Sequence, residues 1–246
     1  MIERLLGTLH PARLLVASDF DGTLAEIVRR PEEARPLPAA LAALRRLREV
    51  VGTVAVISGR AQADLERVLD LPGVRLLGDY GQGGPDPAVA RFRSAAEALV
   101  AGIPGARLEI KPGALALHFR ESPEAAAQVL EAIAGPAAEA GLEARPGRMV
   151  VEILPAGWDK ASALRALVSS TGAGGVVFLG DDYGDRGCFE YLARLGVPHL
   201  AVGVASPETP AEVFAACDLV VESVVAAAGF LSALARAARR RGRAGP

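Results

Sequence analysis

Two aspartates stand one residue apart directly after a short apolar run near the start of the chain. Asp19 and Asp21 follow residues 13–18, which suit a strand buried on both faces of a parallel sheet. A carboxylate placed there can attack phosphorus to form an aspartyl-phosphate, while a second acid two residues on protonates the leaving group. Gly22 and Thr23 then open a turn whose amides and hydroxyl can face phosphate oxygens. The spacing therefore indicates phosphoryl-transfer chemistry.

Further polar groups occur where later apolar runs end or where predicted helices begin. They are Ser58, Arg60, Lys160, Asp181, Asp182 and Asp185. In an open parallel sheet, such groups gather at the carboxyl edge of the strands. Two facing clusters of acids without His or Cys suit Mg²⁺, which prefers carboxylate oxygens, water and substrate phosphate. Ser58 can present its hydroxyl to phosphate, and Lys160 can offset charge on the nucleophile and the phosphate.

Lysine is nearly absent from the chain. Of 27 basic residues only Lys111 and Lys160 are lysines, and the chain has no Asn. Such a skew is typical of a coding bias that uses Arg wherever a long cation suffices. The two remaining lysines are therefore candidates for a specific functional role. The alternative is that they remain by chance.

Strands and helices alternate through the first and last thirds of the sequence. Strands are expected at 13–18, 53–57, 74–77, 176–179, 199–202 and 218–222, and helices at 38–50, 62–69, 160–169, 188–195, 210–216 and 224–241. This alternation is typical of a right-handed parallel α/β layer.

The middle third has a different rhythm, which begins after a glycine- and proline-rich break at residues 81–87. Alternating strands are expected at 107–111, 114–120, 142–145 and 149–154, with turns at Pro112-Gly113 and Pro146-Gly147 and helices at 89–101 and 123–140. This pattern predicts a small α+β insert. We expect a catalytic core at 1–84 and 155–246 and a cap at 85–154.

Four short motifs together resemble those of the haloacid dehalogenase superfamily of phosphatases. They are Asp-Phe-Asp-Gly-Thr-Leu at 19–24, Ser-Gly-Arg at 58–60, Asp-Lys at 159–160 and Gly-Asp-Asp-x-x-Asp at 180–185. The resemblance implies an α/β fold, a Rossmannoid parallel-sheet core with a small inserted α+β cap of the C2 type. It makes Asp19 the nucleophile and Asp21 the general acid and then base, with Ser58 and Lys160 gripping the phosphoryl group. It places Mg²⁺ on Asp19, the Asp21 carbonyl and Asp181, with Asp182 and Asp185 close by, and substrate on Thr23, Gly59 and Arg60.

The insert resembles the cap of the trehalose-6-phosphate phosphatase family. That family has a Glu-x-Lys strand, a Leu-His-Tyr-Arg strand and a Glu-x-x-Pro return, matched here by the strings at 109–111, 117–120 and 152–155. By this resemblance the cap residues that touch the sugar or its phosphate are Lys111, His118, Arg120 and Glu152. The implied activity is Mg²⁺-dependent hydrolysis of trehalose 6-phosphate under a closing lid.

The sequence departs from the family pattern in two places. Gly184 and Arg186 stand where the family has Thr and Glu, and Gly78-Asp79-Tyr80-Gly81 replaces a Gly-x-His-Gly turn. The acids are unchanged, so the sugar is less constrained than the phosphate chemistry. Sucrose phosphate or mannosylglycerate phosphate is an alternative substrate, and a catalytically silent sugar-phosphate sensor is a further alternative.

Several residues have a structural interpretation beside the functional one. Asp19 and Asp21 could only end a strand and cap a helix, Ser58 could only form a turn, and the acids at 181–185 could form a solvated loop. His118 falls on the polar side of its strand, where a structural role is equally weighted. Glu152 either faces a ligand or lies at an exposed edge, and Trp158 is expected to pack rather than to bind sugar.

Composition limits the remaining function classes. The 246 residues are 51% hydrophobic, enough for a real core, and the net charge of −2 gives no basic field for nucleic acid. The apolar runs are far shorter than the ~20 residues of a membrane span, and the start of the chain does not match a signal peptide. Cys188 and Cys217 are expected to be small buried hydrophobes. We expect a cytoplasmic monomer acting on a small-molecule sugar phosphate, with a trehalose-phosphate synthase as a possible partner, and a basic tail at 236–243 that is a solvated or frayed helix end.

Overall fold

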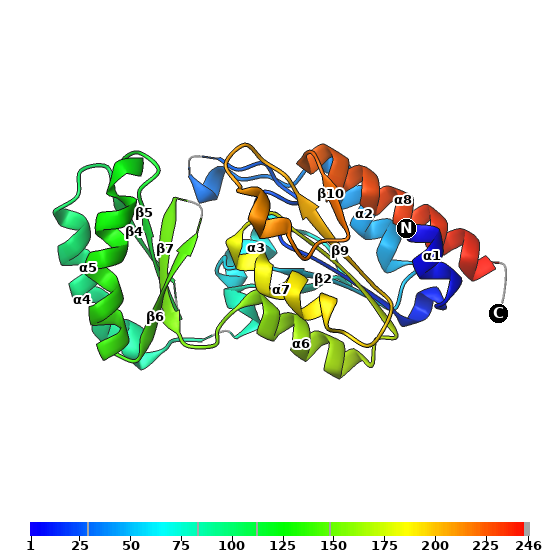
Figure 1. Ribbon diagram of the computed structural model, residues 1–246, viewed down its shortest axis with the longest axis horizontal. Coiled ribbons are helices and arrows are strands. Elements are labelled where there is room, and N and C mark those ends of the chain that lie inside the picture. Colours follow the sequence, from blue (N-terminus) through cyan, green and yellow to red (C-terminus); the bar gives the residue numbers. More distant parts are fainter. Residues whose placement is uncertain (29, 83, 112, 148, 244–246) are drawn as a thin grey trace. The chain divides into compact units, whose positions relative to one another are not determined.

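The computed structural model describes residues 1–28, 30–82, 84–111, 113–147 and 149–243. The chain forms two compact units, one of Met1–Gly81 with Asp159–Pro246 and one of Gln82–Trp158 (Figure 1). The boundaries expected from the sequence are 84/85 and 154/155, of which the second lies within the strand Val150–Pro155. The expected break at 81–87 includes Gly83, which lies outside the described residues.

The first unit is built on a six-stranded sheet in the order β10-β9-β8-β1-β2-β3, in which every pair is parallel. The strands are β1 (Leu14–Ser18), β2 (Thr53–Ile57), β3 (Arg75–Leu77), β8 (Gly175–Gly180), β9 (His199–Val204) and β10 (Leu219–Val221). β1 lies between β8 and β2 and is buried along its whole length. The residues that follow β1 are therefore held at the centre of the sheet's carboxyl edge.

Helices cover both faces of this sheet. One face packs against α1 (Ile2–Gly7), α2 (Pro38–Arg48), α3 (Gln62–Val68) and α8 (Val224–Arg243), and the other against α6 (Lys160–Thr171), α7 (Tyr183–Ala193) and the 3₁₀ turn Ala211–Phe214. Leu14 and Val16 of β1 join the first core, whereas Leu15 and Ala17 join the second. Burial on both faces explains why β1 is an unbroken apolar run in the sequence.

Two predicted helices differ from the structure, and one observed helix was not predicted. α7 begins at Tyr183, not at residue 188, because the Asp182 side chain caps its start and accepts a hydrogen bond from the Gly184 amide at 2.8 Å. The helix predicted at 210–216 is only a 3₁₀ turn. α1 was not predicted, since its six residues are too short to show a helical period.

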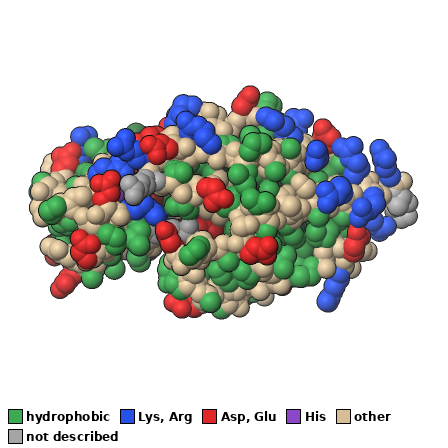
Figure 2. Space-filling model, turned by 90° about the horizontal axis from the view of Figure 1, so that it is seen from above, with side chains coloured by type: hydrophobic (Ala, Val, Ile, Leu, Met, Phe, Trp, Pro, Cys, Tyr) green, Lys and Arg blue, Asp and Glu red, His purple; other side chains and the backbone are tan. Residues whose placement is uncertain are grey.

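The basic end of α8 is exposed, as expected, but it is helical and paired rather than frayed. Arg239 lies 2.7 Å from Glu49, the residue that follows α2, and Arg240 lies 2.9 Å from Glu3 of α1. Arg241 donates to the Leu6 carbonyl at 3.3 Å. Figure 2 shows basic side chains gathered at this end of the unit. Such exposed pairs are each worth at most about 1 kcal/mol, so they orient the helix more than they stabilise the fold.

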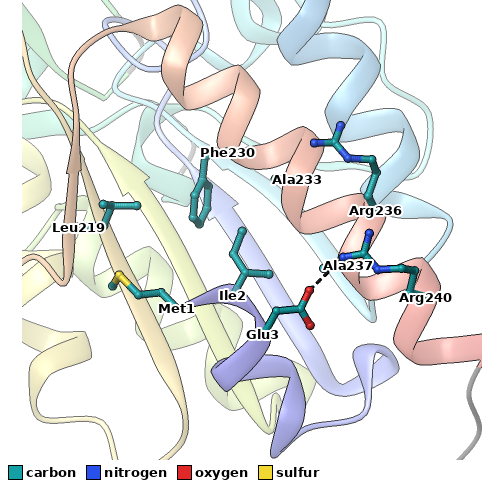
Figure 3. A pocket seen from close by; sticks show the side chains of 9 residues that line it. All are labelled: Met1, Ile2, Glu3, Leu219, Phe230, Ala233, Arg236, Ala237 and Arg240. Carbon is teal, nitrogen blue, oxygen red and sulfur yellow. Dashed lines mark hydrogen bonds and ion pairs between the residues drawn. The ribbon is translucent and has the colours of Figure 1, made fainter.

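A surface pocket of about 480 Å³ lies where α1, β10 and α8 meet (Figure 3). Apolar side chains such as Ile2, Leu219 and Phe230 line it, and Arg236 and Arg240 lie beside it. None of the residues singled out for chemistry in the sequence is among its lining residues.

The second unit is the predicted α+β insert. Its strands are β4 (Arg107–Ile110), β5 (Leu115–His118), β6 (Leu142–Gly147) and β7 (Val150–Pro155), which form an antiparallel sheet in the order β4-β5-β7-β6. α4 (Pro87–Ala101) and α5 (Ala126–Glu139) pack on one face through an apolar core that includes Phe92, Leu117 and Ile133. The opposite face carries the polar side chains of the strands.

One turn prediction in this unit is wrong, and another lies partly outside the described residues. Pro146 and Gly147 belong to β6, where they pair with Val151 and Val150 of β7. Proline is tolerated there because β6 is an edge strand, which needs ladder hydrogen bonds on one side only. Pro112 lies outside the described residues, although Lys111 N donates to the Ala114 carbonyl at 2.9 Å across that turn.

Among the described residues, no helix is long and apolar enough to cross a membrane.

We predict that neither cysteine reacts with a disulfide reagent such as DTNB at pH 8 while the chain is folded. Both thiols are free, and burial, with help from Asp185, raises the pKa of Cys188 well above its usual value. Burial together with Asp218 raises the pKa of Cys217 to about 12, so only ~10⁻⁴ of that thiol is reactive thiolate at pH 8. Two thiols per chain are expected to titrate in guanidinium. Rapid labelling of the native protein, assigned with Cys217→Ser, contradicts this prediction.

Candidate active site

The end of β1 holds two aspartates on either side of a buried ring. Asp19 is 3% exposed, and its amide donates to the Leu179 carbonyl of β8 at 2.8 Å, which continues the pairing of the two strands. Phe20 is fully buried, and its carbonyl accepts from the amides of Leu24 and Ala25. The chain turns sharply at this point. Asp19 is therefore held inside the sheet edge, while Asp21, at 34% side-chain exposure, reaches solvent.

Lys160 lies against the Asp19 carboxylate. Its ammonium is 3.0 Å from Asp19 Oδ1 and 2.9 Å from Asp185 Oδ1. The lysine is the first residue of α6, whose start is fixed by a capping box between Asp159 and Ser162. The helix start thus places a nearly buried cation beside the predicted nucleophile.

Asp185 ties the acidic motif together from the first turn of α7. Its Oδ2 accepts from the amides of Asp181 at 2.8 Å and Asp182 at 3.1 Å, while Oδ1 accepts from Lys160. Asp182 caps the helix and is the most exposed of the three acids. Because both oxygens of Asp185 already accept hydrogen bonds, this residue is suited to positioning Asp181 and Lys160.

Asp19, Asp181 and Asp185 form a buried carboxylate cluster. One oxygen from each lies within 4.8 Å of the others, and in the described part of the chain Lys160 is the ammonium paired with Asp19 and Asp185. Carboxylates this close together in a low-dielectric site repel one another, and a cation among them would relieve that repulsion. The donors are hard oxygens, with no His or Cys in the cluster. The set therefore fits a small divalent cation.

Gly22 and Thr23 pack against Asp181. Thr23 Oγ1 lies 3.5 Å from Asp181 Oδ1. Gly22 has φ +78°, and a Cβ at this position would overlap the Asp181 carboxylate. A glycine is required here for both reasons.

Burial and charge set the protonation tendencies of the cluster. Burial raises the pKa of Asp19 well above its usual value, against the opposing effect of Lys160. Burial likewise raises the pKa of Asp185 to about 6. Burial alone would lower the pKa of Lys160, but Asp185, Asp19 and Asp182 raise it well above its usual value. Lys160 is therefore an ammonium at neutral pH.

The loop after β2 brings Ser58 and Arg60 to the same edge. Ser58 is buried, and its hydroxyl oxygen accepts from the Arg60 amide at 3.2 Å. The Arg60 side chain donates from Nε and Nη2 to the two oxygens of Asp21, each at 2.7 Å. Its guanidinium carbon lies 5.0 Å from the centre of the Phe20 ring. Arg60, which the family resemblance places among the substrate-binding residues, thus contacts the predicted general acid.

A strained turn supports this loop. Asp79 and Tyr80 both have left-handed backbone conformations, with φ 48° and 56°, which are costly for residues other than glycine. The Asp79 amide donates to the Arg60 carbonyl at 2.7 Å, and the Tyr80 amide to the Ser58 carbonyl at 3.0 Å. A Cβ on Gly59 would lie 2.5 Å from the Tyr80 hydroxyl oxygen. The turn therefore fixes the Ser58-Gly59-Arg60 loop.

Tyr80, which the sequence marks as a departure from the family turn, lies near the acidic cluster. It is among the groups whose electrostatic effect raises the pKa of Lys160. The signal for it in the sequence is the replacement of His by Tyr in the Gly-x-His-Gly turn.

The polar face of the second unit's sheet carries paired side chains. Lys111 lies 2.9 Å from Glu152, and His118 Nε2 lies 2.7 Å from Glu109. Glu109 and Glu152 are the cross-strand neighbours of Ala116 on either side, so they share one face. Glu152 is largely buried on β7, an interior strand, and is not at an exposed edge.

Glu109, Arg120 and Trp158 complete the description of this unit. Glu109 was not among the predicted site residues, although the alternation of polar residues along β4 could have indicated it. Arg120 follows the end of β5 and is half-buried. Trp158 packs its ring against Gly113, where a Cβ would overlap the indole. Trp158 therefore packs against the backbone of this unit, as expected.

Comparison with known proteins agrees with these arrangements. Residues 17–216 match the family model of trehalose-phosphatase. The chain belongs to the trehalose-phosphatase family. The haloacid dehalogenase-like fold predicted from the sequence, a parallel-sheet core with a small inserted α+β unit, is also confirmed.

Individual relatives show how far the similarity extends. A trehalose-phosphate phosphatase of Mycobacterium avium is 35% identical over 207 residues, which are 75% of this chain and 52% of the relative. The chain thus spans about half the length of that relative. A bifunctional trehalose-6-phosphate synthase/phosphatase of Thermoproteus tenax is 30% identical over 72% of this chain and 27% of its own length. The C-terminal domain of a Candida albicans trehalose-6-phosphate phosphatase superposes with a TM-score of 0.75 at 20% identity, covering 96% of this chain and 95% of that domain.

The two residues that depart from the family's acidic motif, Gly184 and Arg186, lie in different surroundings. Arg186 Nε pairs with Glu190 at 2.8 Å on the exposed surface of α7, which is an ordinary i,i+4 helix pair. Gly184 lies closer to the chemistry, because a Cβ there would be 3.8 Å from Lys160 Nζ. Of the two, only Gly184 borders the acidic cluster.

We predict that Gly22→Ala folds but loses divalent-cation binding. The added methyl must displace the Asp181 carboxylate, which belongs to the acidic cluster. The expected result is that added Mg²⁺ raises the Tm of the wild type by several degrees and leaves the variant unchanged, as measured by differential scanning fluorimetry.

Gly172→Ala is the matched control, because Gly172 also has positive φ, at +59°, but a Cβ there would meet no atom within 4 Å. Both variants are expected to lose about 1–2 kcal/mol from the left-handed backbone, and only Gly22→Ala loses the response to the metal. An equal Mg²⁺ response in both variants contradicts the prediction.

Proposed function

We propose that this protein is a Mg²⁺-dependent phosphatase that hydrolyses trehalose 6-phosphate to trehalose and phosphate. One observation carries the proposal: in a member of the trehalose-phosphatase family, the Asp19 carboxylate lies 3.0 Å from the Lys160 ammonium. Asp21, the predicted general acid, follows Asp19 by two residues. A silent sensor is not favoured, because the nucleophile and the general acid are both present.

The chain's own residues divide the reaction into two steps. Asp19 attacks phosphorus to give an aspartyl-phosphate, and the phosphorus–oxygen bond to the sugar breaks as Asp21 gives its proton to the departing oxygen. Asp21 then takes a proton from water as that water attacks the aspartyl-phosphate, which releases phosphate and restores Asp19. Lys160 and the Ser58 hydroxyl hold the phosphoryl oxygens. Asp19, Asp181 and the Asp21 carbonyl would hold Mg²⁺, which would supply positive charge to offset the phosphate oxygens and the nucleophile.

Sugar recognition is assigned to the polar face of the second unit. The pairs Lys111–Glu152 and His118–Glu109 provide donors and acceptors at fixed positions, which suits a ligand rich in hydroxyl groups. Arg120 is a further candidate. Another sugar phosphate is the second candidate substrate, because Tyr80 stands where the family has an imidazole. A synthase partner is supported by the fused relative from T. tenax. The monomeric state and the cytoplasmic location stay predictions from the sequence.

We predict that the purified protein with Mg²⁺ releases phosphate from trehalose 6-phosphate faster than from other sugar phosphates. Asp19→Asn removes the nucleophile and is expected to lower kcat by at least about 10³-fold, and excess EDTA is expected to abolish turnover. Phosphate release over a panel that includes sucrose phosphate and mannosylglycerate phosphate measures this. Turnover of another ester alone keeps the phosphatase and discards trehalose 6-phosphate as substrate.

We predict that Glu152→Gln raises the KM for the sugar phosphate by about tenfold or more with little change in kcat, because a sugar contact is lost from ground and transition states alike. Initial rates over a range of substrate concentrations measure the split. Glu97→Gln on α4, which packs on the opposite face of the sheet, is the matched control, since its side chain is 46% exposed and pairs with Arg93. Equal effects of the two substitutions exclude Glu152 from sugar binding.

A further inference from the structure

Arg60 holds both oxygens of one carboxylate at once. Its Nε and Nη2 each lie 2.7 Å from a different oxygen of Asp21. A two-point pair of this kind fixes both the position of a carboxylate and the rotation of its plane, which a single donor cannot do. Asp21 is the partly exposed member of the pair, so without Arg60 its side chain would be free to change rotamer.

The guanidinium is itself fixed on several sides. It lies over the Phe20 ring, and the Arg60 side chain is only 9% exposed. The backbone of Arg60 is held as well, since its carbonyl accepts from the Asp79 amide and its amide donates to the Ser58 hydroxyl. Phe20 separates Asp19 from Asp21 in the chain, so one ring anchors the arginine and spaces the two acids. The fixed position of Asp21 thus derives from two loops and from the strained turn at Asp79 and Tyr80.

This geometry differs from that of an arginine reserved for substrate phosphate. One two-donor edge of the guanidinium, formed by Nε and Nη2, is directed at Asp21. General acid catalysis requires the acid within hydrogen-bond reach of the departing oxygen, and small misplacements are costly.

We propose that Arg60 is a positioning residue for Asp21, which aims that carboxyl group for proton transfer and contributes only to the steps in which Asp21 moves a proton. The proposal rests on the proposed phosphatase function. In the first step, the proton goes from Asp21 to the sugar oxygen as the phosphorus–oxygen bond breaks, and Asp21 is left as the carboxylate that Arg60 holds. In the second step, the same carboxylate accepts the proton of the attacking water.

The test compares two leaving groups with Arg60→Lys, which keeps the charge but loses the two-point geometry. A sugar alkoxide needs a proton to depart, whereas p-nitrophenolate does not. Rapid mixing with excess enzyme measures the first step for each ester. We expect Arg60→Lys to slow the release of sugar from the sugar phosphate by ~100-fold, within the usual range for general acid catalysis. We expect the rate of p-nitrophenolate release to change less than threefold.

Two further variants separate positioning from a structural effect. Asp21→Asn is expected to show the same selectivity, and the double variant Arg60→Lys/Asp21→Asn is expected to lose no more than Asp21→Asn alone. Arg67→Lys, an exposed arginine of α3 paired with Asp64 at 2.9 Å, is the matched control and should change neither rate. If Arg60→Lys does not fold, Arg60→Ala with added methylguanidinium replaces it, and rescue of the sugar phosphate rate alone is expected.

Three results would overturn the proposal. They are an equal loss with both leaving groups, losses in the double variant that multiply, and a weaker inhibition by inorganic phosphate without leaving-group selectivity, which would make Arg60 a phosphate ligand. The wild type reports separately on the proposed function. If it hydrolyses a different sugar phosphate, that ester takes the place of trehalose 6-phosphate in the comparison, and if it hydrolyses no ester, both proposals fail.

Discussion

The ammonium of Lys160 is buried between the carboxylates of Asp19 and Asp185, at 3.0 and 2.9 Å. A buried charge is tolerated only when it is well paired, and loss of one partner typically costs about 3–5 kcal/mol. This arrangement depends on distant elements. β1 and β8 must pair in register to bring up Asp19, α6 must begin at Lys160, and α7 must begin early enough to include Asp185 in its first turn. Much of the core can be understood as the support for this contact.

The carboxylates around this contact lie close enough together to repel one another. One oxygen each of Asp19, Asp181 and Asp185 lies within 4.8 Å of the others, and Lys160 pairs with Asp19 and Asp185, so the three carboxylates repel one another. A divalent cation would relieve this repulsion, and an incoming phosphate would add to it. The acids, the lysine and the cation are therefore interdependent, because each sets the charge that the others experience.

Backbone strain has a clear place in this design. Asp79 and Tyr80 adopt conformations that cost free energy, and their amides hold the carbonyls of Arg60 and Ser58. The loop that results carries the Ser58 hydroxyl and the Arg60 guanidinium that pairs with Asp21. The strained turn at Asp79 and Tyr80 therefore orders the loop of residues 58–60. In this way the substituted turn of this family member supports the carboxyl edge of the sheet.

Local patterns in the sequence were enough for the architecture and for the identity of the acids. Unbroken apolar runs predicted β1, β2 and β8 because these strands are buried on both faces, and motif order indicated the family. Local patterns failed where distant partners decide. The early start of α7 depends on the cap formed by Asp182 and Asp185, and the place of Pro146 depends on β6 being an edge strand. The pairing of Arg60 with Asp21 joins residues 39 positions apart. Composition and periodicity report which side chains are buried, but only the tertiary structure decides which charged group faces which, because that choice depends on strand order and loop geometry.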